Sequence, residues 1–330
     1  MTEDDLIPKL RAITARAAPH ALLLGIGDDA AVWQPSRSRR SVITTDALVE
    51  GVHFTRGAMS AGDAGHRALA SNLSDIAAMG ARPVLATIAF GIGPGTDEDW
   101  ILGCYRGIAA RAERAKCAIA GGDIVRAPAI TISITVVGEV RPSNLKTRAG
   151  MLPGDVVATT GPLGASRAGL AVALEHAVPA DDAAALEALQ AYRTPEPRLA
   201  EGRWLGASRS VHAMMDTSDG LSTDLARLAR ASRTGATIET VPVAAAARAI
   251  AERSGADPER WALDGGEDFE LIVAVATRAF GHLAARFHAR FGRELLRVGF
   301  ATDEGGVRFA GGETVTSAGW DHLRAAPAPA

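Results

Sequence analysis

Short acidic segments that contain glycine, threonine or serine recur along this sequence, and their chemistry would suit metal ions and phosphates. Six of them stand out: Gly27-Asp28-Asp29-Ala30, Thr44-Thr45-Asp46, Asn72-Leu73-Ser74-Asp75, Gly121-Gly122-Asp123, Asp216-Thr217-Ser218-Asp219-Gly220 and Gly265-Gly266-Glu267-Asp268. Mg²⁺ takes oxygen ligands, keeps several waters and is commonly shared between one or two carboxylates and substrate phosphates. Together the segments predict a site for several Mg²⁺ ions and a polyphosphate.

Each segment also has an ordinary structural interpretation, which stays open at this point. A Gly-Asp pair after a strand is usually a turn whose carboxylate caps a helix, and Asp219 could do no more than this. Two observations favour the metal site. Asp28 and Asp29 are adjacent like charges, which are costly without a cation. Asp75 follows Asn72 by one helical turn, so both oxygen-bearing side chains lie on one helix face.

The motifs of the common nucleotide-binding and hydrolytic sites are missing from the sequence. It has no G-x-x-x-x-G-K-[ST], no G-x-G-x-x-G at the start of a helix, no protein-kinase set, no H-E-x-x-H and no G-x-S-x-G. Lysine occurs only as Lys9, Lys116 and Lys146. Neutralisation of phosphate would therefore fall to metal ions and Arg148. The residues predict Mg²⁺-dependent chemistry on a nucleotide at a carboxylate-rich site.

Composition limits the class of protein. Of the 330 residues, 47% are hydrophobic and 22% are charged, and the net charge is −3. These values exclude a disordered chain and disfavour nucleic acid as the main partner. Cys104 and Cys117 are too few for a disulfide framework or a structural zinc site. With no signal-peptide pattern at Met1 and no apolar run of about 18 residues, we expect a cytoplasmic protein without a membrane partner.

Helical and strand patterns alternate, which predicts an α/β or α+β chain of two domains. We expect helices at 3–18, 62–80, 97–116, 220–233, 244–253 and 278–291, and a helical region near 180–207 that is interrupted at 194–197. We expect strands near 41–45, 84–92, 118–120, 130–140, 156–160, 211–215, 236–240, 270–276, 295–300 and 307–310. The acidic segments then follow strand ends. The Pro- and Gly-containing run 141–155 suits a linker between domains at 1–141 and 151–330.

Seven motifs in fixed order carry a resemblance to a known family. They are GIGDDAAV, ITTDALVEGVHF, ALASNLSDIAAMGARP, GGDIVR, TRAG…PGD, DTSDGL and GGEDFEL, and with the segments between them they span roughly residues 20–325. This combination resembles the thiamine-monophosphate kinases of the aminoimidazole-ribonucleotide synthetase superfamily. The resemblance implies a homodimer of two-domain α/β subunits, with a barrel-like dimer core formed by the N-terminal strands. It also implies that residues 1–141 bind ATP and Mg²⁺ and mediate dimerisation, while residues 151–330 complete the nucleotide and substrate site.

The resemblance also implies a role for individual residues. The expected Mg²⁺ ligands are Asp29, Asp46, Asp75, Asp123 and Asp216, with Thr44 and Thr45 adding oxygens and Asp219 holding a further ion. The expected ATP contacts are Tyr105, Gly122, Asp123, Arg148 and Ser218. The expected contacts to thiamine monophosphate are His53, Glu267 and Trp320. Ordinary alternatives remain for three of these, since Tyr105 suits a core aromatic, His53 a loop histidine and Trp320 a packing residue.

The implied reaction is the last step of thiamine diphosphate synthesis: direct in-line transfer of the γ-phosphoryl group of ATP to thiamine monophosphate, without a phospho-enzyme or a catalytic protein nucleophile. The main alternative is another ATP-using member of the superfamily, such as a selenophosphate synthetase or an aminoimidazole-ribonucleotide synthetase. The first of these carries a reactive Cys or selenocysteine near its N-terminus, whereas the first cysteine here is Cys104. A non-catalytic nucleotide-binding regulator would be expected to lose some of the six acidic segments.

Overall fold

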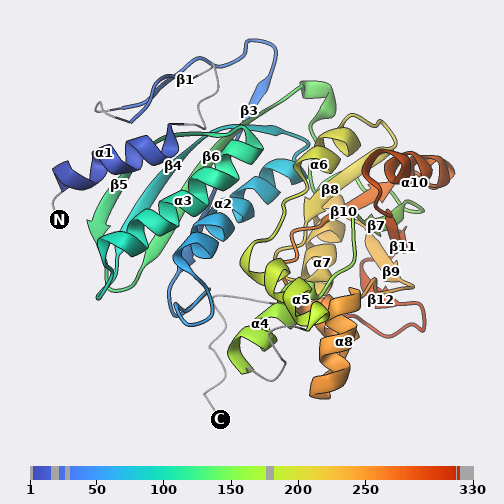
Figure 1. The fold of residues 1–330 in the computed structure, drawn as a ribbon. Coiled ribbons are helices and arrows are strands. Elements are labelled where there is room, and N and C mark those ends of the chain that lie inside the picture. Colours follow the sequence, from blue (N-terminus) through green and yellow to red (C-terminus); the bar gives the residue numbers. More distant parts are fainter. Residues whose placement is uncertain (1–2, 16–21, 27–29, 176–181, 317, 320–330) are drawn as a thin grey trace. The chain divides into compact units, whose positions relative to one another are not determined.

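Two units, each with its own sheet, make up the chain (Figure 1). The computed structural model describes residues 3–15, 22–26, 30–175, 182–316 and 318–319. Unit 1 comprises residues 1–146 and 193–209, and unit 2 comprises residues 147–192 and 210–330. The chain therefore passes from one unit to the other three times.

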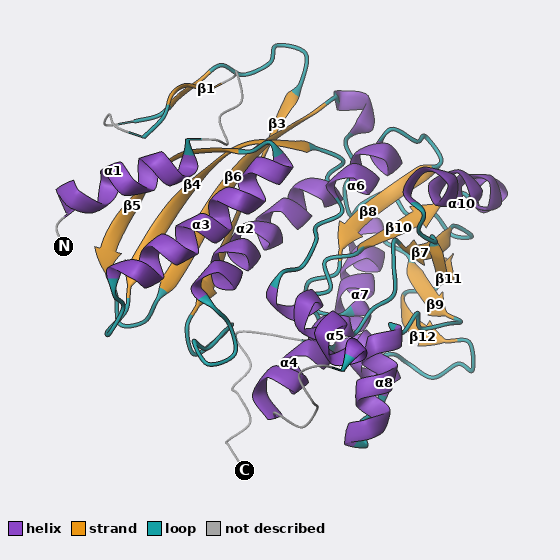
Figure 2. Cartoon of the chain, viewed as in Figure 1, coloured by secondary structure: helices purple, strands orange, loops and turns teal. Residues whose placement is uncertain are grey.

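Unit 1 is built on an open four-stranded sheet in the order β3-β6-β4-β5, with a separate two-stranded ribbon of β1 and β2. Its elements are α1 (Glu3–Thr14), β1 (Leu22–Leu24), β2 (Val32–Trp33), β3 (Arg40–Val49), α2 (Ala61–Ala78), β4 (Arg82–Ile92), α3 (Glu98–Ala115), β5 (Ala118–Arg126), β6 (Thr131–Val140), the short 3-10 helix η1 (Pro142–Asn144) and α6 (Leu199–Gly206). Strands β3 and β4 both pair antiparallel with β6, and β4 pairs parallel with β5. Figure 2 shows α2 and α3 lying side by side along the sheet.

The two faces of this sheet differ in polarity because side chains alternate along each strand. In β6, Ile132, Ile134 and Val136 are buried, whereas Ser133 and Thr135 are only half-buried. Strand β3 has the same alternation, with its odd-numbered positions from 41 to 47 exposed. One face therefore packs under α2 and the other stays largely open.

Glycines allow α2 and α3 to pack backbone against backbone. A Cβ atom on Gly65 would lie 2.0 Å from the carbonyl oxygen of Cys104 in α3. A Cβ atom on Gly107 of α3 would lie 2.0 Å from the carbonyl oxygen of Gly62 in α2. Real Cβ contacts are not this short, so any larger residue would force the helices apart.

Unit 2 is built on a six-stranded sheet in the order β12-β9-β11-β7-β10-β8, in which only β12 and β9 are parallel. Its elements are β7 (Val156–Thr159), α4 (Ala165–Glu175), α5 (Ala183–Arg193), β8 (Val211–Asp216), α7 (Leu221–Ser232), β9 (Gly235–Ile238), α8 (Ala245–Ser254), α9 (Pro258–Asp264), β10 (Leu271–Val275), α10 (Thr277–Phe291), β11 (Leu296–Thr302) and β12 (Gly306–Phe309). Central strands β7 and β10 are buried at every position, as expected for strands covered on both faces.

N–H groups at the start of helix α4 donate hydrogen bonds to a carboxylate that is distant in sequence. Asp268 Oδ2 accepts the N–H of Gly164 at 2.7 Å, and Oδ1 accepts the N–H of Ser166 at 3.1 Å. The N–H groups of a first helical turn have no partner within the helix, so an acceptor here stabilises its start. Burial nevertheless raises the pKa of Asp268 to about 7. The ordinary interpretation of a Gly-Asp segment, helix capping, therefore holds for Asp268.

The mixed α/β character and two-unit organisation agree with the sequence, but several boundaries differ. The first helix ends at Thr14 rather than residue 18, and β1, β2 and α9 were not predicted. Two expected strand ends are wrong, because β3 runs past Asp46 to Val49 and β5 runs past the expected end at Ala120 to Arg126. Strand β5 continues through Gly121 and Gly122 because it pairs with β4 along its length. No helix in the described ranges is both long and apolar enough to cross a bilayer.

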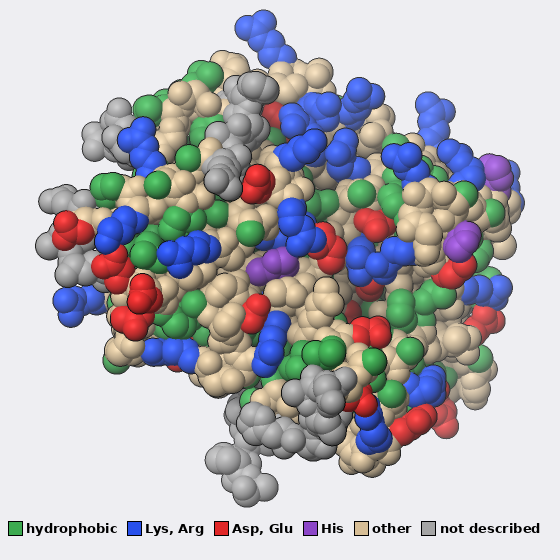
Figure 3. All heavy atoms as spheres, viewed as in Figure 1, with side chains coloured by type: hydrophobic (Ala, Val, Ile, Leu, Met, Phe, Trp, Pro, Cys, Tyr) green, Lys and Arg blue, Asp and Glu red, His purple; other side chains and the backbone are tan. Residues whose placement is uncertain are grey.

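Both signs of charge are visible on the face of the molecule drawn in Figure 3, where basic and acidic side chains lie interspersed. This agrees with a net charge of only −3.

We predict that Gly65→Ala destabilises unit 1 by about 1–3 kcal/mol, because the added methyl overpacks the contact with Cys104. The matched control is Gly281→Ala in α10, where no atom lies within 4 Å of the position that the added Cβ would take. That change should stabilise by up to about 1 kcal/mol through helix propensity. Urea unfolding of both variants checks this. Equal free energies of unfolding for the two variants would contradict the close helix contact.

We predict a pH-dependent stability term from Asp268. Its folded-state pKa of about 7 lies above the ordinary value of 3.8, so between these limits the folded chain holds a proton that the unfolded chain releases. Stability from this group is therefore present at low pH and is lost as pH rises from about 4 to about 7. Across that window, urea unfolding should show wild type losing stability relative to Asp268→Asn, which cannot ionise. Parallel pH curves for the two proteins would refute the raised pKa.

Candidate functional site

Two polar side chains of α2 hold the middle of β3 in unit 1. Asn72 Oδ1 accepts the backbone N–H of Asp46 at 3.1 Å, and Asp75 accepts a short hydrogen bond from the hydroxyl of Thr44. Asn72 is fully buried, while Thr44, Asp46 and Asp75 are half-buried. Three of the predicted metal ligands, Thr44, Asp46 and Asp75, therefore lie around one contact between helix and strand, and all their functional groups are oxygens.

The other predicted ligands of unit 1 lie elsewhere on the sheet. Thr45 is exposed, and its hydroxyl donates to the carbonyl oxygen of Ile134 at 3.1 Å. Asp123 is exposed on edge strand β5, where its Oδ1 accepts the N–H of Ile124 at 2.9 Å. Through the intervening strands Asp46 is level with Gly122, one residue before Asp123. Strand alternation thus places Asp46 and Asp123 on opposite faces of the sheet.

A cavity of about 760 Å³ lies beside β5 in unit 1, within the size range of small-molecule sites. Its walls come from α1, α3, β4, β5 and residues 25, 26, 30 and 31. The lining residues are Ile7, Leu10, Gly25, Ile26, Ala30, Ala31, Thr87, Tyr105, Ala120, Gly121, Gly122, Asp123 and Ile124. Three of the five predicted ATP contacts, Tyr105, Gly122 and Asp123, therefore lie in one cavity.

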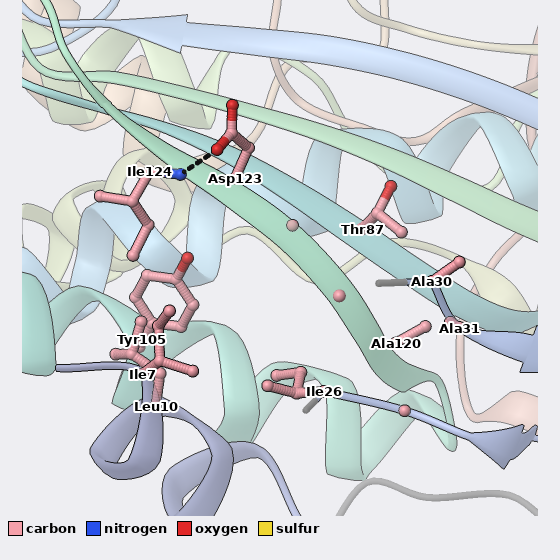
Figure 4. Close-up of a pocket in the computed structure, with 13 residues that line it drawn as sticks. Ile7, Leu10, Ile26, Ala30, Ala31, Thr87, Tyr105, Ala120, Asp123 and Ile124 are labelled. Carbon is pink, nitrogen blue, oxygen red and sulfur yellow. Dashed lines mark hydrogen bonds between the residues drawn. The ribbon is translucent and has the colours of Figure 1, made fainter. Parts of the chain in front are cut away.

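Figure 4 shows Ile7 and Leu10 of α1 grouped with the ring of Tyr105. In this view Asp123 lies beside Ile124, and Thr87 lies apart from both, towards Ala30 and Ala31. Tyr105 is 4% exposed and its ring packs at 5.9 Å from that of Phe90. Burial raises the pKa of Tyr105, so its hydroxyl stays protonated. Tyr105 is thus both a core aromatic and a cavity residue.

Sequence reasoning missed α1 as a wall of this cavity. The apolar positions Leu6 and Leu10 are buried and Ile7 is 40% exposed, which is typical of an amphipathic helix with one face packed. This spacing was visible in the sequence, but it could not indicate what the helix covers.

Gly122 is required by close backbone approach. A Cβ atom there would lie 2.0 Å from the carbonyl oxygen of Ile88 in β4, whereas nothing lies within 4 Å of a Cβ on Gly121. Gly122 therefore has a structural reason to be glycine, beside any contact with a ligand.

The loop after β3 holds His53 in a defined orientation. His53 Nδ1 accepts the N–H of Val49 at 3.0 Å, which assigns the proton of the neutral ring to Nε2. The next residue, Phe54, is buried and stacks on Trp100 of α3 with ring centroids 6.3 Å apart. Arg56 pairs with Glu50 across the same loop, with Arg56 Nε 2.6 Å from the carboxylate. These contacts present His53 at the end of β3.

In unit 2 the two remaining acidic segments form one hydrogen-bonded assembly. The N–H groups of Glu267 and Phe269 donate to the carbonyl oxygens of Ser218 and Thr217 at 2.8 and 3.0 Å, and Thr217 donates in turn to Glu270 at 2.8 Å. The predicted residues Ser218, Asp219 and Glu267 are therefore carried by adjoining loops, and Asp216 directly precedes the first of them. Asp216, the last residue of β8, is 3% exposed.

The backbone of the second loop is unusual. Gly266, Glu267 and Phe269 have φ values of +66°, +57° and +50°. Left-handed conformations in non-glycine residues store strain and gather at functional sites. A Cβ on Gly266 would also lie 2.6 Å from the carbonyl oxygen of Ser218, so glycine is needed for the loops to meet.

Asp219 has a cationic partner within its own unit. Its carboxylate forms a short ion pair with Arg227 Nη1, which also lies 3.0 Å from Asp224 Oδ1. Asp224 is fully buried, and burial raises its pKa to about 6. Sequence reasoning did not single out Asp224 or Arg227. Their helical spacing of three was visible, but a carboxylate and an arginine one turn apart usually indicate only a surface ion pair.

Of three further predicted residues, the structure describes only Arg148. Arg148 is exposed, and its carbonyl oxygen accepts the hydroxyl of Ser232 at 2.8 Å. Asp29 and Trp320 lie outside the described residues. Gly319, the neighbour of Trp320, donates its N–H to the Thr223 hydroxyl at 3.2 Å, beside the 216–220 loop.

The donor chemistry of both units suits a hard cation, because the predicted ligands offer carboxylate and hydroxyl oxygens and no sulfur or imidazole. Among the residues that the structure describes, no three His, Cys, Asp or Glu side chains group closely enough to hold one ion unaided. The donors fit Mg²⁺ in its usual role, in which water and substrate phosphates complete the coordination.

Two family models match the chain: AIR synthase related protein, N-terminal domain, over residues 27–140, and AIR synthase related protein, C-terminal domain, over residues 153–308. The thiamine-monophosphate kinase of Rhodopirellula baltica is 39% identical over 83% of this chain and 82% of its own. The crystal structure of thiamine-monophosphate kinase from Stenotrophomonas maltophilia K279a has a TM-score of 0.85 at 34% identity, and covers 95% of this chain and 98% of that chain. A structure of AaThiL complexed with AMPPCP and TMP has a TM-score of 0.77 at 28% identity and covers 97% of each chain. The chain therefore belongs to the AIR synthase related family and, within it, to the thiamine-monophosphate kinases.

Proposed function

We propose that this chain transfers the γ-phosphoryl group of ATP to thiamine monophosphate, giving thiamine diphosphate and ADP. One observation carries the proposal: in a chain of this family, Tyr105, Gly122 and Asp123 line one cavity of nucleotide size. The relative solved with AMPPCP, an ATP analogue, and TMP supports the same pair of substrates. An activity on other acceptors within the superfamily is the alternative that the assay below addresses.

ATP is assigned to the cavity beside β5. Its base would lie against Ile7, Leu10 and the ring of Tyr105, because the planar base gains from leaving water there. Its phosphates would lie toward Gly122 and Asp123, which line the same cavity. Arg148 and Ser218 of unit 2 are proposed as further ATP contacts.

Thiamine monophosphate is assigned to His53, Glu267 and Trp320. A neutral His53 with its proton on Nε2 can donate a hydrogen bond to a phosphate oxygen. Glu267 is a carboxylate held by a strained backbone, which suits an anion that must face the cationic thiazolium ring. Trp320 would stack on one of the two rings of the substrate.

Several Mg²⁺ ions are proposed, with Asp29, Thr44, Thr45, Asp46, Asp75, Asp123, Asp216 and Asp219 as their ligands. Because strand alternation places Asp46 and Asp123 on opposite faces of the unit 1 sheet, these two would serve different ions. When bound, Mg²⁺ offsets the repulsion between the two phosphate groups and neutralises charge on the transferred group. Asn72 supports this set by holding the backbone of Asp46, and the Thr44 hydroxyl orients Asp75.

The reaction needs position more than covalent chemistry. A terminal oxygen of thiamine monophosphate forms a new bond to the γ-phosphorus as the bond from that phosphorus to the β,γ-bridging oxygen breaks, and ADP keeps the electron pair. The attacking oxygen is already ionised, so no protein base is required. The side chains named above hold the two phosphates in line.

We also propose a cytoplasmic homodimer with the domain roles expected from the sequence, residues 1–141 for nucleotide, metal and dimer contacts and 151–330 for completing the site. The open face of the unit 1 sheet supports a barrel-like dimer core, because Ile43 on β3 is 69% exposed and Val125 on β5 is 50% exposed.

We predict that the purified protein forms thiamine diphosphate when it is given ATP, Mg²⁺ and thiamine monophosphate. Chromatography of the reaction products measures this.

Asp46→Asn should lower kcat by about 100-fold or more, because a neutral amide is a poor ligand for a hard cation.

Asp99→Asn is the matched control for this variant. It makes the same charge change on an exposed residue of α3 that does not line the cavity, and it should leave kcat within about twofold of wild type. ADP release without thiamine diphosphate would reject the proposed acceptor, and full activity of Asp46→Asn would remove Asp46 from the metal site.

Ile7→Ala is predicted to raise KM for ATP about fivefold, because roughly 1 kcal/mol of apolar contact with the base is lost. KM for thiamine monophosphate should not change. Arg11→Ala, an exposed change on the same helix, is the control and should leave both constants as they are. Steady-state kinetics with each substrate varied would decide, and an unchanged KM for ATP in Ile7→Ala would place the base elsewhere.

A further inference from the structure

We propose that Asp224 and Arg227, two residues of α7, are positioning residues that set where Ser218 and Asp219 stand in the phosphoryl-transfer site. The proposal rests on the function proposed above, because it takes Ser218 as an ATP contact and Asp219 as a metal ligand. Neither Asp224 nor Arg227 is itself placed against substrate or metal.

One carboxylate oxygen of Asp224 holds the loop backbone. Asp224 Oδ2 accepts the N–H of Ser218 and the N–H of Asp219, each at 2.9 Å. These two N–H groups stand at the start of α7, where a capping side chain would normally accept them. Its N-cap is Gly220, which has a φ of +102° and no side chain to accept a hydrogen bond.

The second oxygen of Asp224 governs the Asp219 side chain through a shared cation. Arg227 Nη1 lies 3.0 Å from Asp224 Oδ1 and forms a short hydrogen bond with the carboxylate of Asp219. A planar guanidinium between two carboxylates fixes direction as well as distance. The buried carboxylate of Asp224 therefore holds the backbone of Asp219 directly and its side chain through Arg227.

The same assembly reaches the substrate loop. The carbonyl oxygen of Ser218 accepts the N–H of Glu267, so a displacement of Ser218 would be passed to the residue assigned to thiamine monophosphate. Asp224 is 0% exposed, which leaves it little freedom to follow a change in the loop. A rigid reference inside unit 2 is what a site needs when both reacting phosphates must be in line.

Asp224→Asn separates these two duties, because an amide has only one acceptor oxygen. The variant can keep the two backbone hydrogen bonds or face Arg227, but its NH₂ group cannot accept from Arg227. We expect kcat to fall about tenfold or more and the half-saturating Mg²⁺ concentration to rise about threefold or more, as for the loss of a group that orients a ligand. Amide hydrogen exchange in the peptide covering residues 216–221 should become faster.

Asp182→Asn is the matched control. Asp182 also accepts an N–H at the start of a helix, from Ala185 at 3.0 Å, and pairs with an arginine, Arg253, at 2.6 Å, but it lies outside both loops of the site. This variant should leave kcat, the Mg²⁺ dependence and the exchange of residues 216–221 unchanged.

Arg227→Gln covers the case in which Asp224→Asn does not fold. The Arg227 side chain is 36% exposed, so its replacement leaves the core intact, and kcat should still fall about threefold or more. Wild-type activity in Arg227→Gln, or Asp224→Asn with unchanged Mg²⁺ dependence and unchanged exchange, would overturn the positioning role.

Failure of the proposed kinase activity can be distinguished from failure of the positioning role. A wild-type protein that makes no thiamine diphosphate would reject the proposed function. Exchange of residues 216–221, and Mn²⁺ affinity measured by calorimetry without thiamine monophosphate, would then still decide whether Asp224 orders the loop and its metal ligand.

Discussion

The polar side chains of both units depend on backbone segments that approach more closely than any side chain would allow. Gly65 lets α2 lie against α3, since a Cβ atom on it would lie 2.0 Å from the Cys104 carbonyl oxygen, and α2 in turn carries Asn72 and Asp75 to β3. Gly266 lets the loop of Glu267 meet the carbonyl oxygen of Ser218. Because these contacts join the elements that hold oxygen donors, a methyl group at either glycine would move a potential ligand as well as a helix or loop.

Local pattern was enough to predict most of the elements and the interruption at 194–197, because apolar periodicity and proline act within a few residues. It also found each acidic segment. It could not predict that residues 216–220 and 265–270 would adjoin, since their hydrogen bonds join backbone groups of two distant loops. The left-handed backbone at Glu267 and Phe269 was equally hidden, because it results from that contact and not from the residue types.

The end of β5 was predicted too early because of its two glycines. Consecutive glycines weaken a strand considered alone, so an end at Ala120 was the natural expectation. In the fold the parallel partner β4 supplies the hydrogen bonds, and close approach to Ile88 makes Gly122 the residue that fits. The roles of Leu10 and Asp224 were also hidden, because a sequence does not show which residues become neighbours in the fold. The apolar character of Leu10 and the acidic character of Asp224 were evident. Sequence therefore locates donors of the site better than it locates what orients them.

The three lysines of the chain all lie in unit 1, and their positions bear on how the charge of phosphate-bearing substrates would be offset. Lys9 pairs with Glu98, Lys146 donates to the carbonyl oxygen of Ser208 at 2.9 Å, and Lys116 ends α3 in a left-handed conformation. Each lysine thus has a structural position within unit 1, and none lines the cavity beside β5. Arg227 is likewise engaged with Asp219. If two phosphate-bearing substrates meet in this chain, lysine is poorly placed to offset their charge at the cavity beside β5, which leaves that part to arginine and to the proposed divalent ions.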